Sequence, residues 1–174
     1  MAPSSIIAGL TPKTQNLKEV FLGYLISAAE IALKDEPKTL RYSIALPRDE
    51  NAPGAKSIYV LEEYEDGAGF DVHLQQKAVQ SIMHHVENGG LADEPVTLML
   101  SIDGSLNFTR SDIDQLSDPF VTVTEFFYKP GTGRDALLEI ASVFAAGKAE
   151  SGTWGLSLYP EANSEDVLRV VGNI

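Results

Sequence analysis

The sequence has no cysteine among its 174 residues, and its basic residues are scarce. Without cysteine there are no disulfides, no thiol catalysis and no thiolate metal sites, and such a chain fits the cytoplasm. Only 13 Lys and Arg stand against 25 Asp and Glu, which gives a formal net charge of −12. Nucleic acids and anionic membranes attract clustered Lys and Arg, so we expect neither as a partner.

Long apolar runs and several well-known motifs are missing as well. The amino-terminal residues MAPSSIIAGLTPK have no basic start and only a short apolar patch, Ile6–Leu10, so we expect neither a signal peptide nor a membrane span. There is no P-loop, dinucleotide-binding glycine motif, serine-hydrolase elbow or zinc-ligand spacing. The hydrophobic fraction is 44%, and a chain of this length can bury a core without metal or disulfide.

The first hundred residues predict the element order β-α-β-β-α-β. Apolar residues recur at three- and four-residue intervals from Leu17 until Pro37 ends the helix. A second helix is predicted over Phe70–His85, and Gly89-Gly90 stops it. The predicted strands are Ile6–Leu10, Leu40–Leu46, Ile58–Tyr64 and Val96–Ile102.

The second half repeats the first in shortened form. Glu36–Ile44 and Glu150–Leu158 share the pattern E-x-x-T-apolar-x-apolar-S-apolar, each after a predicted helix and into a predicted strand. A repeat of about a hundred residues indicates a duplicated domain. We therefore predict a first repeat at 1–103, a linker with one short helix at 104–119, and a second repeat at 120–174.

The second repeat is predicted to be incomplete. Its expected elements are the strand Phe120–Tyr128, the helix Arg134–Lys148 and the strands Thr153–Tyr159 and Val167–Val171, with no final helix and strand. Such a unit leaves a sheet edge unpaired, which is a liability in a soluble monomer. Either another chain covers this edge, as in a homodimer, or the chain is a truncated product.

Polar side chains gather where the strand Ile58–Tyr64 meets the following helix. Because side chains alternate along a strand, Glu62 and Tyr64 share one face. His73 lies early in the helix and can reach back toward the strand end. A carboxylate, a phenol and an imidazole together form a proton-transfer set. The same groups also suit a structural hydrogen bond that closes the strand–helix corner.

The sequence pattern of this region resembles that of the antibiotic biosynthesis monooxygenase family. That family has a strand with a glycine and a tyrosine, the motif E-x-W at a strand end, and F-x-x-H at the start of a helix. This chain has corresponding segments, with Tyr64 at the tryptophan position and Lys38 at the glycine position: Thr39–Ile44, Tyr59–Tyr64 and Phe70–Leu74. The resemblance covers 17–102 well and 120–171 more weakly. It implies an α+β fold in which ferredoxin-like β-α-β-β-α-β repeats join into a dimeric α/β-barrel architecture.

The resemblance also implies a function. Members of this kind are cofactor-independent monooxygenases of secondary metabolism whose aromatic or polyketide-like substrate itself donates electrons to O2, so neither flavin nor metal is needed. His73 would act as the base, beside Glu62, with Tyr64 or Tyr42 as hydrogen-bond donor. Candidate substrate-binding residues are Tyr42, Tyr24 and Trp154.

Two alternatives remain open. A non-catalytic barrel, binding a ligand or associated with stress, is favoured because Gly172-Asn173-Ile174 stands where the second repeat would carry the motif. Haem-degrading relatives ligate iron through a histidine on the corresponding helix, and His84 falls within about one residue of that position. The tryptophan and asparagine of those proteins are missing here. The acidic run from Glu62 to Asp66 points to opposite faces, so we expect no metal site there.

Overall fold

The computed structural model describes most of the first hundred residues and selected strands beyond them. The described residues are 4–51, 54–101, 107–109, 120–127, 129, 132, 146, 155–161 and 164–173. The chain divides into two compact units, Met1–Met99 and Leu100–Ile174, and each is described by itself.

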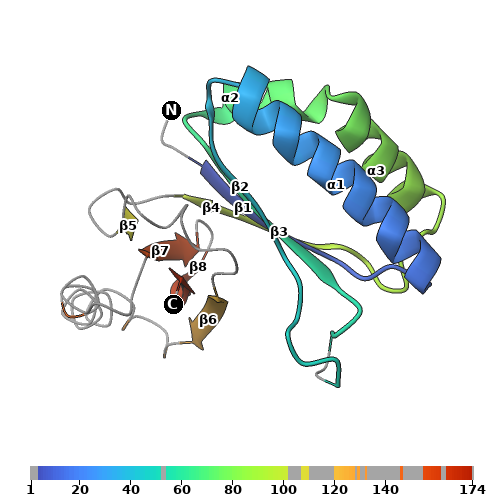
Figure 1. The fold of residues 1–174 in the computed structure, drawn as a ribbon. Helices are drawn as coiled ribbons and strands as arrows, with labels where there is room; N and C mark the ends of the chain where they lie inside the picture. The colour runs from blue at the N-terminus through green and yellow to red at the C-terminus, as the bar shows by residue number, and fades with distance from the viewer. Residues whose placement is uncertain are drawn as a thin grey trace. The chain divides into compact units, whose positions relative to one another are not determined.

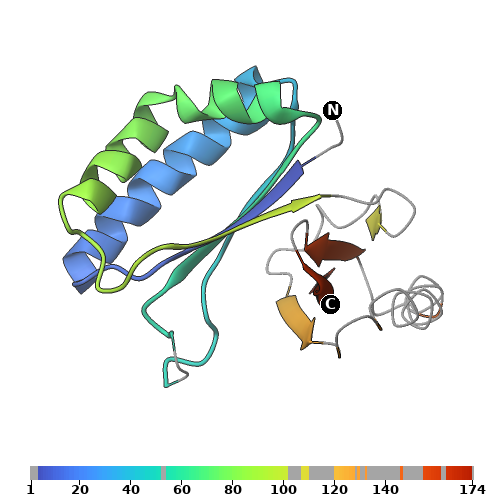
Figure 2. The same cartoon turned by 180° about the vertical axis from the view of Figure 1, so that it is seen from behind.

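The first unit is a four-stranded sheet covered on one face by three helices (Figures 1 and 2). The strand order is β2-β3-β1-β4, and β3 runs antiparallel to both of its neighbours. The elements, in chain order, are β1 (Ser4–Leu10), α1 (Gln15–Asp35), β2 (Thr39–Ala45), β3 (Ile58–Tyr64), α2 (Gly67–Leu74), α3 (Lys77–Glu87) and β4 (Val96–Ser101). The predicted α+β class and the ferredoxin-like order of this repeat are thereby confirmed.

The core of this unit lies between the sheet and the helices. Alternate residues of β3 point into it, and Ile58, Val60 and Tyr64 are almost completely buried. The register pairs Ile6 and Tyr42 with Glu62, so side chains from three strands share this face. Helix α1 buries one stripe against them, made of Phe21, Leu25, Ala28 and Ala32.

The single helix predicted over Phe70–His85 is wrong, because the segment forms two helices. Helix α2 begins earlier, where the Asp66 side chain caps it by accepting from the Gly69 N–H at 3.0 Å. The helix then breaks at Gln75 and Gln76, and Gln76 adopts an extended conformation with φ −63° and ψ 141°. The side chain of Gln76 donates to Glu36, so a tertiary contact is made where the periodicity indicated continuous helix.

The second unit contains a four-stranded sheet in the order β5-β7-β8-β6. Its strands are β5 (Asn107–Thr109), β6 (Val121–Phe127), β7 (Gly155–Glu161) and β8 (Ser164–Asn173). The order β7-β8-β6 matches β2-β3-β1 of the first unit. Strand β5 lies within the stretch expected to be a polar linker, where it pairs with β7.

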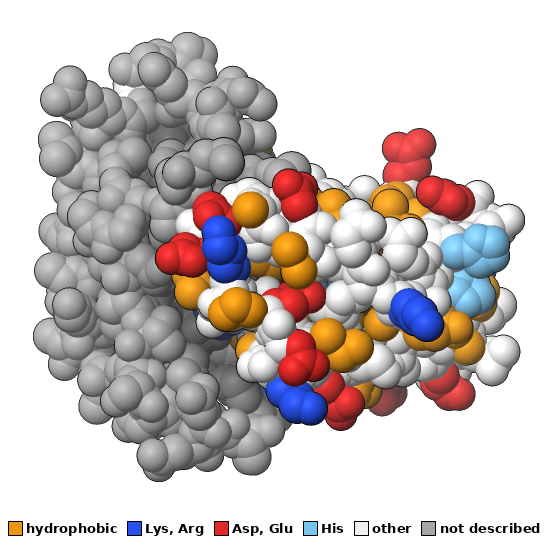
Figure 3. All heavy atoms as spheres, turned by 90° about the horizontal axis from the view of Figure 1, so that it is seen from above, with side chains coloured by type: hydrophobic (Ala, Val, Ile, Leu, Met, Phe, Trp, Pro, Cys, Tyr) orange, Lys and Arg blue, Asp and Glu red, His pale blue; other side chains and the backbone are white. Residues whose placement is uncertain are grey.

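Some predictions fall on residues that the structure does not describe. These are the short helix of the linker, Trp154, and the helix Arg134–Lys148 apart from Ala146, which is helical. The barrel arrangement and the homodimer stay predictions. Among the described helices, none combines the length and apolar character that crossing a membrane requires. Figure 3 shows acidic, basic and apolar side chains interspersed on the described part of the viewed face.

Gly69, at the start of α2, lies very close to the backbone of Lys38. A Cβ atom on Gly69 would lie 2.8 Å from the Lys38 Cβ and 3.2 Å from its carbonyl oxygen. We therefore expect Gly69→Ala to lower the free energy of unfolding by about 1–3 kcal/mol, as measured by urea denaturation. Gly23 is the matched control, because a Cβ there meets nothing within 4 Å. Gly23→Ala should raise that free energy by about 0.5–1 kcal/mol, and equal effects of the two changes would contradict the close approach.

Candidate functional site

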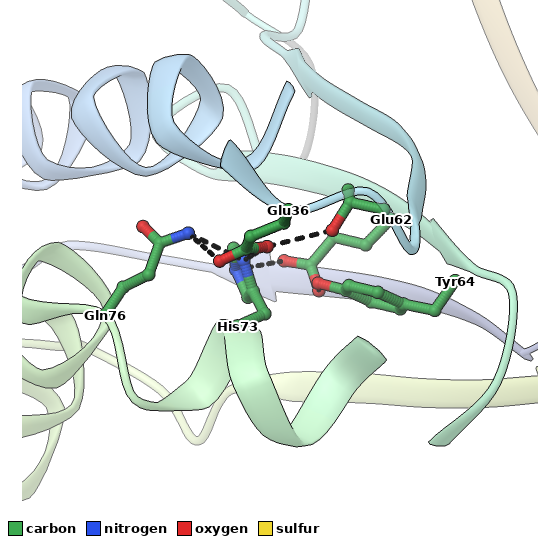
Figure 4. Close-up of polar contacts among 6 residues, drawn as sticks. Glu36, Glu62, Tyr64, His73 and Gln76 are labelled. Atoms are coloured by element: carbon green, nitrogen blue, oxygen red, sulfur yellow. Dashed lines mark hydrogen bonds and ion pairs between the residues drawn. The ribbon is translucent and has the colours of Figure 1, made fainter. Parts of the chain in front are cut away.

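The polar residues predicted at the strand–helix joint form one buried cluster (Figure 4). Strand β3 supplies Glu62 and Tyr64, β2 supplies Tyr42, and α2 supplies His73. Two further groups come from segment ends: Glu36 directly follows α1, and Gln76 lies at the break between α2 and α3. The cluster therefore connects the end of α1 and the α2–α3 segment to the inner strand β3 of the sheet.

Glu36 and Glu62 accept the hydrogen bonds of the cluster. Glu36 Oε2 accepts from Thr39 Oγ1 at 2.9 Å and lies 3.1 Å from His73 Nδ1. The Gln76 amide nitrogen donates to the other oxygen of the same carboxylate. Glu62 Oε2 accepts from the Tyr64 hydroxyl at 2.9 Å. Since both carboxyl groups are largely buried, these donors replace the water that each would otherwise bind.

His73 lies between the two carboxyl groups and is only 2% exposed. Its Nε2 atom is 4.0 Å from Glu62 Oε1, which is within ion-pair range but longer than a hydrogen bond. Two aromatic rings flank the imidazole, with centroid distances of 5.3 Å to Tyr42 and 5.7 Å to Tyr64. The imidazole is thus held at Nδ1 and packs against two tilted phenol rings, while Nε2 points toward Glu62.

Burial changes the acidity of three groups in the cluster. It raises the pKa of Glu62 above the ordinary value of 4.5, although His73 and the Tyr64 hydrogen bond oppose the rise. It also raises the pKa values of Tyr42 and Tyr64 far above those of free phenols, and the nearby Glu62 adds to both shifts. Both phenols therefore stay protonated at neutral pH and do not act as bases, and the Tyr64 hydroxyl donates to Glu62.

Four of the six predicted site residues meet in this cluster: Tyr42, Glu62, Tyr64 and His73. Tyr24 does not belong to it. It precedes Glu36 by twelve residues, which is about 18 Å along a helix axis, and its ring packs against His85 at 5.7 Å. Trp154 lies outside the described residues.

The sequence reasoning missed the importance of Glu36, Thr39 and Gln76. The first two did carry a signal, because they are the E and T of the E-x-x-T pattern that both halves share. The structure explains the spacing, since the Thr39 hydroxyl donates to the Glu36 carboxylate across the turn between α1 and β2. Gln76 carried no comparable signal, because a glutamine inside a helical pattern is ordinary.

His84, the histidine considered for haem, and its neighbour His85 both contact other side chains. His84 is exposed at the end of α3, and its Nδ1 lies 3.2 Å from the Asn88 side-chain nitrogen. His85 packs against Phe21 and Tyr24, with centroid distances of 5.9 Å and 5.7 Å. Within the described part of the chain, no group of three or more His, Asp or Glu side chains is arranged to hold a metal ion.

The raised pKa of Glu62 predicts a pH-dependent stability. The folded state binds this proton more tightly than the unfolded chain does, so the stabilisation is complete below about pH 4.5. It is lost as pH rises through the folded-state pKa. Glu62→Gln keeps an acceptor for Tyr64 but has no charge to bury. We therefore expect the free energy of unfolding of this variant to gain on the wild type between pH 4 and 8, as urea denaturation at each pH would measure. A difference that shrinks or reverses with rising pH would contradict the buried carboxyl group.

No protein-family model matches the chain, and no curated protein matches its sequence. A candidate monooxygenase from Fusobacterium nucleatum subsp. nucleatum ATCC 25586 matches its structure with a TM-score of 0.82 and 13% identity, over 99% of this chain and 75% of that protein. A candidate monooxygenase from Lactobacillus acidophilus NCFM matches with a TM-score of 0.78 and 12% identity, over 99% of this chain and 77% of that protein.

A shorter protein, a candidate antibiotic biosynthesis monooxygenase from Caulobacter crescentus CB15, matches 57% of this chain and 89% of its own length, with 18% identity and a TM-score of 0.47. The two longer matches, by contrast, span nearly the whole chain. The chain therefore shares its fold with these two proteins over nearly its whole length, and the resemblance drawn from the sequence is confirmed at the level of the fold.

Proposed function

We propose that the protein is a monooxygenase of the antibiotic biosynthesis type that oxygenates a small, electron-rich aromatic molecule. The observation that carries this proposal is the likeness of nearly the whole chain to two candidate monooxygenases. The motif residues Glu62, Tyr64 and His73 support it, because they come together with Tyr42 in one cluster. A shared fold is compatible with many functions, so oxygen uptake by the protein is the direct measure of the activity.

The proposed reaction needs no electron donor other than the substrate. In an anthrone-type substrate, loss of a proton gives an anion that transfers electrons to O2, and a new C–O bond forms as a hydroperoxide. Loss of water from the hydroperoxide leaves a carbonyl group. One oxygen atom ends in the product and one in water, while the substrate's CH2 group supplies both hydrogens and all four electrons.

The cluster's role in this reaction is to take up the proton. Glu62 has the more exposed side chain of the facing pair, 11% against 2% for His73, so it is the group that exchanges with a ligand or solvent. Its raised pKa suits a carboxyl group that gains and loses a proton nearer neutral pH. The distance of 4.0 Å from Glu62 to His73 Nε2 must shorten for transfer, as catalytic hydrogen bonds often do once substrate binds.

A second candidate function is a non-catalytic ligand-binding barrel, and the burial of the cluster favours it. The hydrogen bonds of the cluster join mainly its own members, which are Glu36, Thr39, His73 and Gln76. These bonds connect the end of α1 to β2 and to the break between α2 and α3. A hydrogen-bond network that only stabilised the fold would have the same contacts. The two functions differ in what happens when His73 is replaced in a protein that still folds.

Oxygen uptake with a panel of anthrones and hydroquinones tests the proposed activity. We expect His73→Gln to lower kcat/KM by about 10²–10⁴-fold, which is the usual contribution of a positioned acid–base group. His84→Gln is the matched control, because His84 is an exposed histidine away from the cluster. It should retain the wild-type rate.

Circular dichroism and urea denaturation would show that both variants are folded at the assay temperature. Equal oxygen uptake by wild type and a folded His73→Gln variant would remove His73 from the mechanism. The absence of uptake above the buffer rate, with every substrate and in the wild type, would favour the non-catalytic barrel.

A further inference from the structure

Glu36 occupies a position that disfavours a buried carboxylate, so its presence there needs a reason. It directly follows α1, whose carboxyl end carries a partial negative charge that repels an acidic side chain. The side chain is only 6% exposed. The backbone at Glu36 is extended, with φ −113° and ψ 91°, because Pro37 follows it. This bend turns the carboxylate away from the helix axis and toward α2.

Three donors surround the Glu36 carboxylate. The Thr39 hydroxyl donates to Glu36 Oε2, and the Gln76 amide nitrogen donates to Oε1. The third neighbour is His73 Nδ1, 3.1 Å from Oε2. An ionised carboxylate accepts hydrogen bonds and donates none, so a stable contact at this distance requires a hydrogen on Nδ1.

The competing arrangement places the hydrogen on Nε2 instead. Gln76 Nε2 lies 3.3 Å from His73 Nδ1 and would then donate to it. That arrangement, however, directs the Nδ1 lone pair at the Glu36 oxygen 3.1 Å away, inside a buried site where repulsion between two acceptors is poorly screened. With the hydrogen on Nδ1, both His73 and Gln76 donate to Glu36, and no acceptor faces another.

We propose that Glu36 is a positioning residue that holds His73 in the Nδ1–H tautomer, so that Nε2 is the one ring atom able to accept a proton. Nε2 faces Glu62, while the rings of Tyr42 and Tyr64 restrict rotation of the imidazole. Glu36 thus acts on the chemistry through His73 and touches no substrate. Its catalytic consequence rests on the proposed monooxygenase function, whereas the tautomer itself is a property of the folded protein.

The break between α2 and α3 also helps to hold the Glu36 carboxylate in place. Gln76 leaves helical geometry and its side chain reaches Glu36. The carboxylate is thereby held at both oxygens, at Oε2 by Thr39 and His73 and at Oε1 by Gln76. A carboxylate held at both oxygens cannot rotate away from His73 Nδ1. The tautomer therefore depends on contacts from Thr39, His73 and Gln76 together and not on one contact alone.

The direct test is nitrogen NMR of the histidine rings in the full chain at pH 8, with His73 assigned by comparison with His73→Gln. We expect an Nδ1 signal of the protonated type and an Nε2 signal of the unprotonated type in the wild type. In Glu36→Gln the new amide can either accept from or donate to Nδ1. We therefore expect both ring tautomers to be populated in that variant.

Thr39→Val is the matched control. It removes a donor to the same carboxylate and should lower stability, but it leaves the contact between Glu36 and His73 in place. We expect its His73 signals to match the wild type. A wild-type His73 protonated at Nε2, alone or together with Nδ1, would overturn the proposal. So would a Glu36→Gln variant with wild-type ring signals.

Oxygen uptake supplies the second readout and separates this proposal from the proposed function. In a folded Glu36→Gln protein, kcat should fall by about 100-fold with little change in KM, because the wrong tautomer presents a hydrogen where an acceptor is required. A normal kcat with altered ring signals would overturn the positioning role. Wild-type protein without oxygen uptake, but with the expected tautomer, would count against the monooxygenase function alone.

Discussion

The corner of the first unit depends on one buried carboxylate, that of Glu36. An unpaired charge at this depth would cost several kcal/mol, so the fold is stable only if donors converge on it. They come from three segments: Thr39 at the start of β2, His73 in α2 and Gln76 at the α2–α3 break. The need to satisfy one acidic side chain thus positions the end of α1 against the sheet, interrupts a helix and orients an imidazole.

Stability and the proposed chemistry are linked through this arrangement. The contacts that orient His73 also connect the helices to the sheet, and the sheet side of the cluster carries Glu62 with its raised pKa. Burial raises the pKa values of Tyr42 and Tyr64, so both phenols remain protonated and neither serves as the proton acceptor of the cluster. A protein with this fold can therefore keep the cluster for structure alone or also use it for proton transfer.

Much of the first repeat was predictable from sequence, because its strands and first helix have clear apolar periodicity. The meeting of Glu62, Tyr64 and His73 was predictable too, since strand alternation and the F-x-x-H spacing fix their directions. The helix break was not, because the residue at the break, Gln76, makes a hydrogen bond to the distant Glu36, and a long-range contact leaves no trace in the apolar periodicity. Tyr24 was grouped with the site by residue type, although its place in the middle of α1 puts it beside His85. Strand β5 was missed because a short, polar strand looks like a linker.

A double-mutant cycle between Glu36 and His73 tests most directly whether the carboxylate organises the corner. Glu36→Gln, His73→Leu and the double variant would be compared with the wild type by urea denaturation at pH 8. The structure predicts a coupling energy of about 1–3 kcal/mol between the two positions, because His73 Nδ1 directly contacts the Glu36 carboxylate inside the buried cluster. Additive effects, with a coupling energy near zero, would contradict the central place of this contact.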